Sequence, residues 1–431
     1  MFRIPRYVRL LLFLCTVSTI LCAFFIISVY IADKKNDEKT FAIRTEDRKQ
    51  TLQVSMKSMK KRFFNDDQIR KMTLLGKWLV SSEGHSPPPK INTKKGPYLI
   101  LIWKHGKFLE RRHIKRFTNN EFSPWENCSV QDCVLTYQST DLDTADAVVF
   151  HLHLTKDVSE LPARRRLDQR WIFLTDESPM HTFLYGRQKL SNYNGFFNWS
   201  MTYRMDSDVP VPYGRTITRS YINSQDADFP KNYIKKSKTK VATVMASNCG
   251  GTNGRWDYVK ELKSFLGKDL DIYGKCLNGN TAACPGHFDK DCPALNEYKF
   301  YLAFENSNCK EYLTEKVFWH GYHKSAVPII MGAPKEDCEH LLPPKSFLHV
   351  NDFANPSALA NYLQYLNRHD DKYLEYHEWR RYFKVINEHG YFGSISRHYC
   401  RICEALHYNV PSIKVYDDME SFWNRKQDCD L

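Results

Sequence analysis

Residues 301–322, "YLAFENSNCKEYLTEKVFWHGY", begin as an apolar strand, turn polar at Glu305, and continue as a helical pattern in "YLTEKVFWHGY". Strand, loop and helix in this order are the repeating unit of α/β folds. The same order points backbone N–H groups and the positive end of a helix at an anion. Lys316 adds a mobile cation suited to phosphate, Glu315 can accept hydrogen bonds from sugar hydroxyls, and Tyr312 can pack on a ring. The segment therefore predicts either a nucleotide-sugar pocket or an ordinary exposed helix start.

Similar apolar runs recur from residue 98 onward, and helical patterns separate several of them. The runs are nearly continuous rather than alternating, which is typical of strands buried on both faces of a parallel sheet. In "RWDYVKELKSFL" and "SALANYLQYLNRH" leucines and a valine recur on one helical face. The chain therefore predicts an α/β fold. The runs are 98–103, 145–152, 171–175, 240–247, 270–274, 299–304, 327–332 and 347–350.

A turn-rich and basic stretch between residues 205 and 238 divides this region into two halves. We expect an N-terminal α/β domain at 97–230, a C-terminal α/β domain at 239–395, and a cysteine-containing segment at 396–431. Open parallel sheets bind ligands at the carboxyl ends of their strands, so a ligand site is expected where the two halves face each other.

The N-terminal region has the pattern of a membrane anchor. Residues 10–32 carry no charge and follow Arg3, Arg6 and Arg9. This length spans a bilayer as a helix, and the arginines place residues 1–9 in the cytosol. A cleaved signal peptide is the alternative, although its apolar core would be shorter. Residues 33–96 are rich in charged and polar residues and end in three prolines, so we expect a partly helical stem.

The remainder of the chain would then be lumenal. Asn127 and Asn198 begin glycosylation sequons, and 11 of the 13 cysteines lie beyond residue 32. An oxidising lumen favours disulfides, and the odd number leaves at least one cysteine free or bonded to another chain. The chain has 62 Lys and Arg against 49 Asp and Glu, a net charge of +13. In the lumen this charge is expected to serve a phosphorylated substrate or the membrane face, not nucleic acid.

Several blocks of the sequence resemble the α1,3-fucosyltransferases of glycosyltransferase family 10. "FENSNCKEYLTEK" is similar to the family signature F-E-N-S followed by Y-x-T-E-K, and the similarity continues through "VPIIMGAP". Further similar blocks keep the family order and cover about 97–405. They are "DESP" (176–179), "FNWSMTYRMDSDVPVPYG" (197–214), "SNCGGTNGR" (247–255) and "CRIC" (400–403). "SNC…DIYGKC" and "FENSNC" resemble the invertebrate and plant core-type enzymes.

The resemblance implies a GT-B fold, with two Rossmann-like domains facing across a cleft, and GDP-fucose as the donor. It implies inversion at the transferred sugar, with Glu177 as general base. The residues that match donor contacts are Arg255, Asn306, Tyr312, Glu315 and Lys316, and more weakly Ser247, Asn248 and Tyr213. Asn308, Cys309 and Lys310 match no assigned role.

The chemistry of these residue types agrees with the implied roles. Glu177 follows the apolar run 171–175, and a free carboxylate is ionised at neutral pH and can accept the proton of an attacking hydroxyl. A surface ion pair is the alternative for Glu177. Asp176 is the second candidate base, although neighbouring strand residues point to opposite faces. Arg255 and Lys316 suit the growing charge of a pyrophosphate leaving group, with a solvated helix residue as the alternative for Arg255.

Metal use and the CRIC cysteines leave alternatives open. Asp-x-Asp triplets, the usual divalent-ion motif of sugar-nucleotide transferases, begin at Asp141, Asp206 and Asp269. Only the middle one lies in a family block, where the resemblance suggests a structural role. We expect no obligatory metal and leave stimulation by Mn²⁺ or Mg²⁺ open.

Cys400 and Cys403 fit a zinc half-site with His398 and His407, a redox pair, or disulfides, which an oxidising lumen favours. Family analogy makes Cys128 and Cys133 their partners. The aromatic helix expected at 373–383 fits core packing better than sugar stacking.

The expected protein is a single-pass type II Golgi membrane enzyme with a lumenal catalytic region. It would transfer L-fucose from GDP-fucose to the 3-hydroxyl of GlcNAc in a glycoprotein glycan, with the core GlcNAc of N-glycans as the leading acceptor. Lewis-type transfer to LacNAc or LacdiNAc antennae is the alternative acceptor choice. A non-catalytic lumenal glycan-binding protein is the alternative from another functional class.

Overall fold

The computed structural model describes residues 64–81, 86–92, 94–186, 188–219, 231–284, 286, 288–411 and 414–429, with only the backbone at 231–233. The predicted tail 1–9, the anchor 10–32 and residues 33–63 of the predicted stem lie outside these ranges. None of the helices within the ranges combines the length and the apolar run that a bilayer crossing needs.

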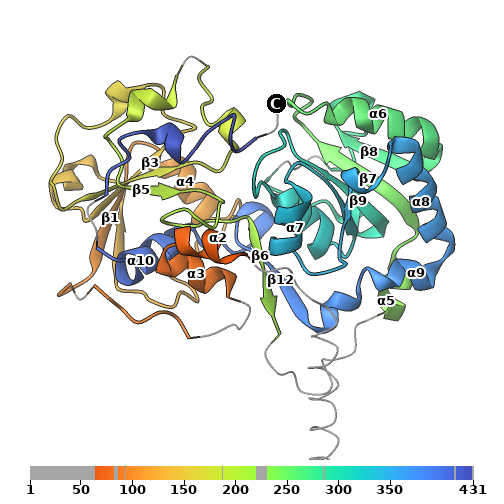
Figure 1. Ribbon diagram of the computed structural model, residues 1–431, viewed down its shortest axis with the longest axis horizontal. Coiled ribbons are helices and arrows are strands. Elements are labelled where there is room, and N and C mark those ends of the chain that lie inside the picture. Colours follow the sequence, from red (N-terminus) through yellow and green to blue (C-terminus); the bar gives the residue numbers. More distant parts are fainter. Residues whose placement is uncertain are drawn as a thin grey trace, which may run out of the picture. The chain divides into compact units, whose positions relative to one another are not determined.

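The N-terminal half contains a five-stranded parallel sheet with the order β2-β1-β3-β4-β5 (Figure 1). Every residue of β3 is buried, as expected for an inner strand covered on both faces. The elements of this half are β1 (Tyr98–Ile102), α4 (Gly106–His113), β2 (Cys133–Thr136), β3 (Ala147–His151), β4 (Arg170–Leu174) and β5 (Trp199–Met201).

The C-terminal half contains a second five-stranded parallel sheet with the order β11-β10-β9-β7-β8. Its central strand β9 is buried at every residue, and α6 packs against α8, as Figure 1 shows. The first elements are α5 (Lys231–Ser237), β7 (Lys240–Ala246), α6 (Arg255–Leu266), β8 (Leu270–Gly274) and β9 (Tyr298–Phe304). The wide-turned helix η8 (Lys316–His323) follows, with β10 (Val327–Met331), α7 (Lys335–Leu341), β11 (Leu348–His349), α8 (Pro356–Arg368) and α9 (Asp370–Glu375).

The α/β fold with parallel sheets is confirmed, and each of the eight apolar runs forms a strand. The sequence reading missed β2 and β5, which are only four and three residues long. It also missed β6 (Gly214–Thr218) and β12 (Phe383–Asn387), which form an antiparallel ribbon between chain segments of the two predicted domains. These strands carry charged and polar residues, so they lack the continuous apolar pattern that marks the others.

The predicted stem extends too far toward the C-terminus. Residues 66–71 and 74–80 form helices α2 (Asp66–Lys71) and α3 (Leu74–Val80), and Leu75 and Leu79 are buried in the core of the N-terminal half. The i, i+4 spacing of these leucines makes one apolar face, which packs against the core rather than staying in solvent. Residues 64–80 therefore belong to the globular part, not to the stem.

The predicted C-terminal segment 396–431 also packs on the N-terminal half. Helix α10 (His398–Tyr408) is buried along its whole length and contacts α3. Disulfides join Cys128 to Cys400 and Cys133 to Cys403, with Cα–Cα distances of 5.6 and 6.0 Å. These bonds link segments more than 250 residues apart in the chain, so they constrain the unfolded chain strongly.

The remaining cysteines of the described chain form three further disulfides and one free thiol. The remaining pairs are Cys249–Cys276, Cys284–Cys292 and Cys309–Cys429. Cys338 is buried and is the free cysteine of the described chain.

Residues 373–383 do not form one helix, because α9 ends at Glu375. The core-packing interpretation is confirmed, since Tyr373 and Trp379 are 1% and 2% exposed.

Peptide mapping can test the cross-links of α10. Trypsin cuts after Arg401 and separates Cys400 from Cys403, while a protease that cuts before Asp132 separates Cys128 from Cys133. A non-reducing digest with both enzymes should yield Cys128–Cys400 and Cys133–Cys403 peptides in mass spectrometry. Cys338 should react with an alkylating reagent only after denaturation, because it is buried in the folded protein. A Cys128–Cys403 or Cys400–Cys403 peptide would contradict this connectivity.

Candidate active site

Glu177 lies directly beyond the carboxyl end of β4 and meets the C-terminal half. Its Oε2 accepts hydrogen bonds from Asn306 Nδ2 at 3.2 Å and from Tyr312 Oη at 3.1 Å. Both donors belong to the loop after β9. The side chain is only partly buried, and Oε1 has no hydrogen-bond partner among the residues that the structure describes. One carboxylate oxygen is therefore held in place while the other can accept a proton.

Asp176, the second candidate base, is committed to a buried ion pair. It is 6% exposed and is paired with Arg112 of α4, and it accepts a hydrogen bond from His398 Nε2 at 3.0 Å. Burial would raise the pKa of Asp176, but the charge of Arg112 and the hydrogen bond from His398 hold it well below its ordinary value. Asp176 is therefore a structural anion, and Glu177 is the carboxylate that faces the site.

The sequence assigned no role in the active site to Arg112 and His398, the two residues that contact the Asp176 carboxylate. Arg112 Nε also donates to the backbone oxygen of His389 at 2.9 Å. The Tyr213 hydroxyl donates to the backbone oxygen of Asp176 at 3.1 Å. The buried pair thus fixes the backbone that carries Glu177. A run of basic residues such as "RRH" gave no sign of this, because such runs are usually solvated.

Lys316 and Glu315 lie in a charged cluster at the start of η8. Lys316 Nζ contacts Glu305 Oε2 at 2.9 Å, Thr314 Oγ1 at 3.0 Å and Glu315 Oε1 at 3.3 Å. Burial would lower the pKa of Lys316, but Glu305 and Glu315 raise it, so the ammonium stays charged. Burial also opposes ionisation of Glu315, yet Lys316 and nearby histidines lower its pKa to about 2. Lys316 and Glu315 are therefore a fixed pair of opposite charges at neutral pH.

Arg255 begins α6, as the sequence predicts, but it is 3% exposed and bonded to backbone. It donates to the backbone oxygens of Gly250 at 3.0 Å, Phe304 at 3.0 Å and Asn248 at 2.8 Å. A guanidinium has five N–H donors, so two are left after these contacts. Arg255 and Lys316 line one small pocket between β7 and α6. The solvated-helix alternative is therefore wrong, and the phosphate contact stays a prediction.

The glycine-rich loop and the loop after β9 contact each other directly. Thr252 N donates to the Asn306 backbone oxygen at 2.8 Å, and Asn253 Nδ2 donates to Asn308 Oδ1 at 2.9 Å. Ser247 and Asn248 are exposed on the glycine-rich loop. Tyr213, in contrast, lies beneath Asp176 in the N-terminal half, and its donor contact is untested. The structure thus brings Glu177, Asn306, Tyr312, Arg255, Glu315 and Lys316 to one region.

The three residues without a predicted role hold the loop in place. Asn308 accepts from Asn253, Cys309 is bonded to Cys429, and Lys310 Nζ lies 3.5 Å from Asp206. Their neighbour Glu311 is buried with φ of 55° and accepts from Met205 N at 2.7 Å. Burial, together with Asp206 and Asp337, raises the pKa of Glu311 to about 8. The polar residues of this stretch are thus divided between the site and its support.

The middle Asp-x-Asp triplet has partners within the protein. Asp206 pairs with Arg204 at 2.6 Å, and Asp208 accepts from Ser200 N at 2.9 Å and from the Tyr416 hydroxyl at 2.8 Å. These contacts agree with the structural role that the resemblance suggested.

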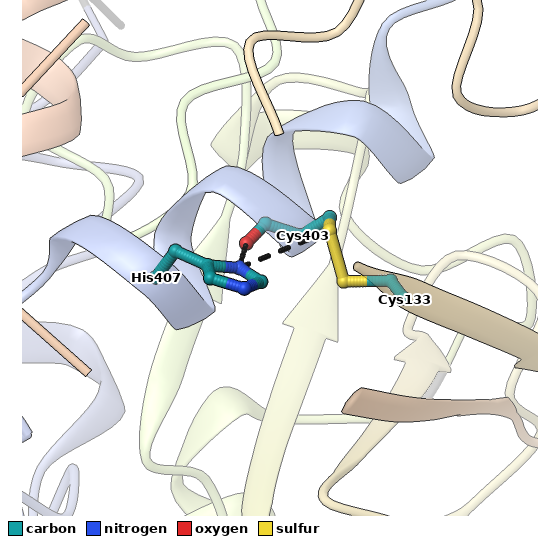
Figure 2. A group of neighbouring side chains, drawn as sticks. All are labelled: Cys133, Cys403 and His407. Carbon is teal, nitrogen blue, oxygen red and sulfur yellow. Dashed lines mark hydrogen bonds between the residues drawn. A yellow bond between two sulfur atoms is a disulfide. The ribbon is translucent and has the colours of Figure 1, made fainter. Parts of the chain in front are cut away.

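Cys403 and His407 are neighbours on α10, but the Cys403 sulfur is bonded to Cys133, as Figure 2 shows. His407 Nδ1 lies 2.8 Å from the Cys403 backbone oxygen and can only donate to it. A sulfur in a disulfide is not a thiolate ligand, so the zinc half-site interpretation is wrong here.

The two glycosylation sequons differ in exposure. Asn127 is exposed, and its modification stays a prediction. Asn198 is 1% exposed, and its Nδ2 donates to the Lys414 backbone oxygen at 2.8 Å, while its Oδ1 accepts from Trp171 N at 2.9 Å. A glycan on Nδ2 would break this buried contact, so the expectation of glycosylation at Asn198 is wrong for the folded protein.

The ion pair of Asp176 can be tested by substitution. Asp176→Asn would leave the Arg112 charge buried without its partner, and we expect a loss of about 3–5 kcal/mol in stability. The control is Asp132→Asn. Asp132 is 2.8 Å from Lys90 in an exposed pair, and its loss should leave the melting temperature close to that of the parent. Thermal unfolding followed by circular dichroism measures both, and equal shifts for the two variants would contradict the anchoring role of Asp176.

Comparisons with known proteins identify the family of the chain. Residues 95–214 match the model "Fucosyltransferase, N-terminal", and residues 235–423 match "Glycosyltransferase family 10 (fucosyltransferase) C-term". A solved structure of an α1,3-fucosyltransferase with GDP-fucose aligns over 81% of this chain and 99% of that chain. Its TM-score is 0.43 at 16% identity.

Curated relatives come from invertebrates and mammals. Glycoprotein 3-alpha-L-fucosyltransferase A of Drosophila melanogaster is 34% identical over 70% of this chain. The match spans only 56% of the length of the Drosophila protein. Alpha-(1,3)-fucosyltransferase fut-5 of Caenorhabditis elegans is 34% identical over 71% of this chain and 81% of its own length. The human 4-galactosyl-N-acetylglucosaminide 3-alpha-L-fucosyltransferase FUT6 is 36% identical over 64% of this chain and 71% of its own length. The chain therefore belongs to glycosyltransferase family 10, the α1,3-fucosyltransferases.

Proposed function

We propose that this fucosyltransferase moves L-fucose from GDP-fucose to the 3-hydroxyl of GlcNAc in a glycoprotein glycan, with inversion at the transferred carbon. The observation that carries the proposal is the state of Glu177. Its Oε2 is held by Asn306 and Tyr312, and its Oε1 is left without a partner among the described residues. A base for the acceptor hydroxyl needs this combination of a fixed position and an open oxygen.

In the proposed reaction the acceptor hydroxyl gives its proton to Glu177 Oε1 while its oxygen bonds to the anomeric carbon of fucose. The bond from that carbon to the phosphate oxygen breaks, and GDP leaves with the electron pair. The negative charge that grows on the pyrophosphate is expected to be stabilised by Lys316 and by the two remaining N–H groups of Arg255. Arg255 and Lys316 each follow one of the two loops that contact each other through Thr252 and Asn306, which supports this assignment. In the GT-B arrangement that we propose, the two parallel sheets supply the acceptor and donor sides.

The proposed donor contacts follow from the same geometry. Glu315 is ionised, with a pKa of about 2, and can accept hydrogen bonds from a ribose diol or another sugar hydroxyl. Cationic side chains can replace a divalent ion at the pyrophosphate, so we propose that no metal is obligatory. Five disulfides support an oxidising compartment, and we propose a lumenal catalytic region of a type II Golgi membrane protein.

Among acceptors we propose the core GlcNAc of N-glycans. The support is the resemblance of "SNC…DIYGKC" and "FENSNC" to core-type enzymes, and the cysteines of both blocks are paired in the structure. The relatives do not separate this from Lewis-type transfer, since identities are 34% to the Drosophila protein and 36% to the human one.

An acceptor panel tests the proposed function. The purified protein should transfer fucose from GDP-fucose to a glycopeptide with a core N-glycan faster than to LacNAc or LacdiNAc, with the linkage determined by mass spectrometry and NMR. A preference for LacNAc would overturn the core assignment. Transfer from another nucleotide sugar but not from GDP-fucose would overturn the donor. Absence of GDP release with every acceptor would favour a non-catalytic glycan-binding protein.

The role of Glu177 can be tested with Glu177→Gln, which keeps the size of the side chain and removes the base. We expect kcat to fall about 10²–10⁴-fold, the usual contribution of a positioned base. Glu261→Gln, at an exposed position of α6, is the matched control and should keep parental kcat. A Glu177→Gln enzyme as fast as the parent would show that the proton is removed elsewhere.

A further inference from the structure

Tyr391 packs on Arg112, the ion-pair partner of Asp176, and was not assigned a role by sequence. It follows β12 in a short turn, where its backbone N–H donates to His389 Nδ1 at 3.0 Å. The Arg112 guanidinium lies 4.2 Å from the centre of the Tyr391 ring, and the Phe288 ring stacks at 4.1 Å with an interplanar angle of 16°. Two groups this close to the ring centre must occupy opposite faces. A ligand can therefore reach Tyr391 only at its hydroxyl edge.

The hydroxyl of Tyr391 differs from those of its neighbours. The Tyr312 hydroxyl donates to Glu177, and the Tyr213 hydroxyl donates to the Asp176 backbone. The Tyr391 hydroxyl has no hydrogen-bond partner in the described part of the chain. The Tyr391 side chain is only partly buried, and its hydroxyl oxygen is not enclosed by protein, so the hydroxyl reaches solvent-accessible space. An accessible donor with no internal partner is available to a substrate.

Arg112 connects Tyr391 to the segment that carries the base, because this guanidinium lies over the Tyr391 ring and pairs with Asp176, the residue before Glu177. Burial raises the pKa of Tyr391, and the carboxylates of Asp176, Glu315 and Glu177 add to this against the opposing charge of Arg112. The hydroxyl therefore keeps its proton at neutral pH and acts as a donor.

The segment that carries Tyr391 is fastened to the N-terminal half. Arg112 Nε donates to the His389 backbone oxygen at 2.9 Å, and Gly393 N donates to the Arg116 backbone oxygen at 3.0 Å. Both partners belong to α4 and the residues after it. Tyr391 is thus tied to the half that carries Glu177, the side expected to bind the acceptor, and through Phe288 also to the C-terminal half.

We propose that Tyr391 is an acceptor-binding residue, whose hydroxyl donates a hydrogen bond to an oxygen of the acceptor GlcNAc and orients the 3-hydroxyl toward Glu177 Oε1. The inference rests on the proposed function, which it extends from the base to the recognition of the acceptor sugar. Tyr391 takes no proton and forms no bond to fucose.

Tyr391→Phe tests this role, because it removes the hydroxyl and keeps the ring that packs on Arg112 and Phe288. We expect KM for the glycan acceptor to rise about 3- to 10-fold, the size of one net hydrogen bond. KM for GDP-fucose and the hydrolysis of GDP-fucose without acceptor should not change. Tyr365→Phe is the matched control, since Tyr365 is 38% exposed on α8 and should give parental constants.

Three outcomes would overturn the inference. Parental acceptor KM in Tyr391→Phe would show that the hydroxyl makes no contact with the acceptor. A rise in KM for GDP-fucose, or a change in acceptor-free hydrolysis, would place the contact on the donor instead. If the parent protein transfers no fucose to any acceptor, the proposed function fails and this inference fails with it. Equal melting temperatures of parent and variant confirm that the comparison concerns binding.

Discussion

The buried ion pair between Arg112 and Asp176 connects segments that are far apart in the chain. Arg112 comes from α4, Asp176 follows β4, and His398 of α10 completes the contact. The same guanidinium bonds the His389 backbone and lies over the Tyr391 ring. A charge pair removed from water is costly unless further hydrogen bonds are made to its atoms. Here His398 donates a hydrogen bond to Asp176, and the His389 backbone oxygen accepts one from Arg112. The position of Glu177, one residue beyond Asp176, depends on this arrangement.

Two neighbouring carboxylates thereby acquire different chemistry. Successive side chains at the end of a strand point to opposite sides, so Asp176 faces the buried Arg112 and Glu177 faces the C-terminal half. Glu177 is held at one oxygen by Asn306 and Tyr312, residues more than 120 positions later. The loop that supplies these donors is itself restrained by the Cys309–Cys429 bond and by the glycine-rich loop. The base is therefore positioned jointly by both halves of the molecule.

The parts of the prediction that failed share a physical cause. Residues 64–80 lie toward the end of a mostly polar stretch, yet two leucines four positions apart form a face that the core covers. Asn198 sits in a sequon, yet its amide completes a buried backbone contact. In each instance a local pattern was correct, and a partner distant in the chain changed what the residue does.

The sequence by itself determined the α/β class, the eight principal strands and the family. Continuous apolar runs specify buried parallel strands through local periodicity, and motif order is a property of the linear chain. It also identified Glu177, Asn306, Tyr312, Glu315 and Lys316 as one group. Only the tertiary structure decided which oxygen of Glu177 is open, how the cysteines pair, and that Arg112 and His398 hold Asp176, with Tyr391 packed on Arg112. These depend on contacts between segments hundreds of residues apart, and no local pattern encodes which distant side chain will satisfy a buried charge.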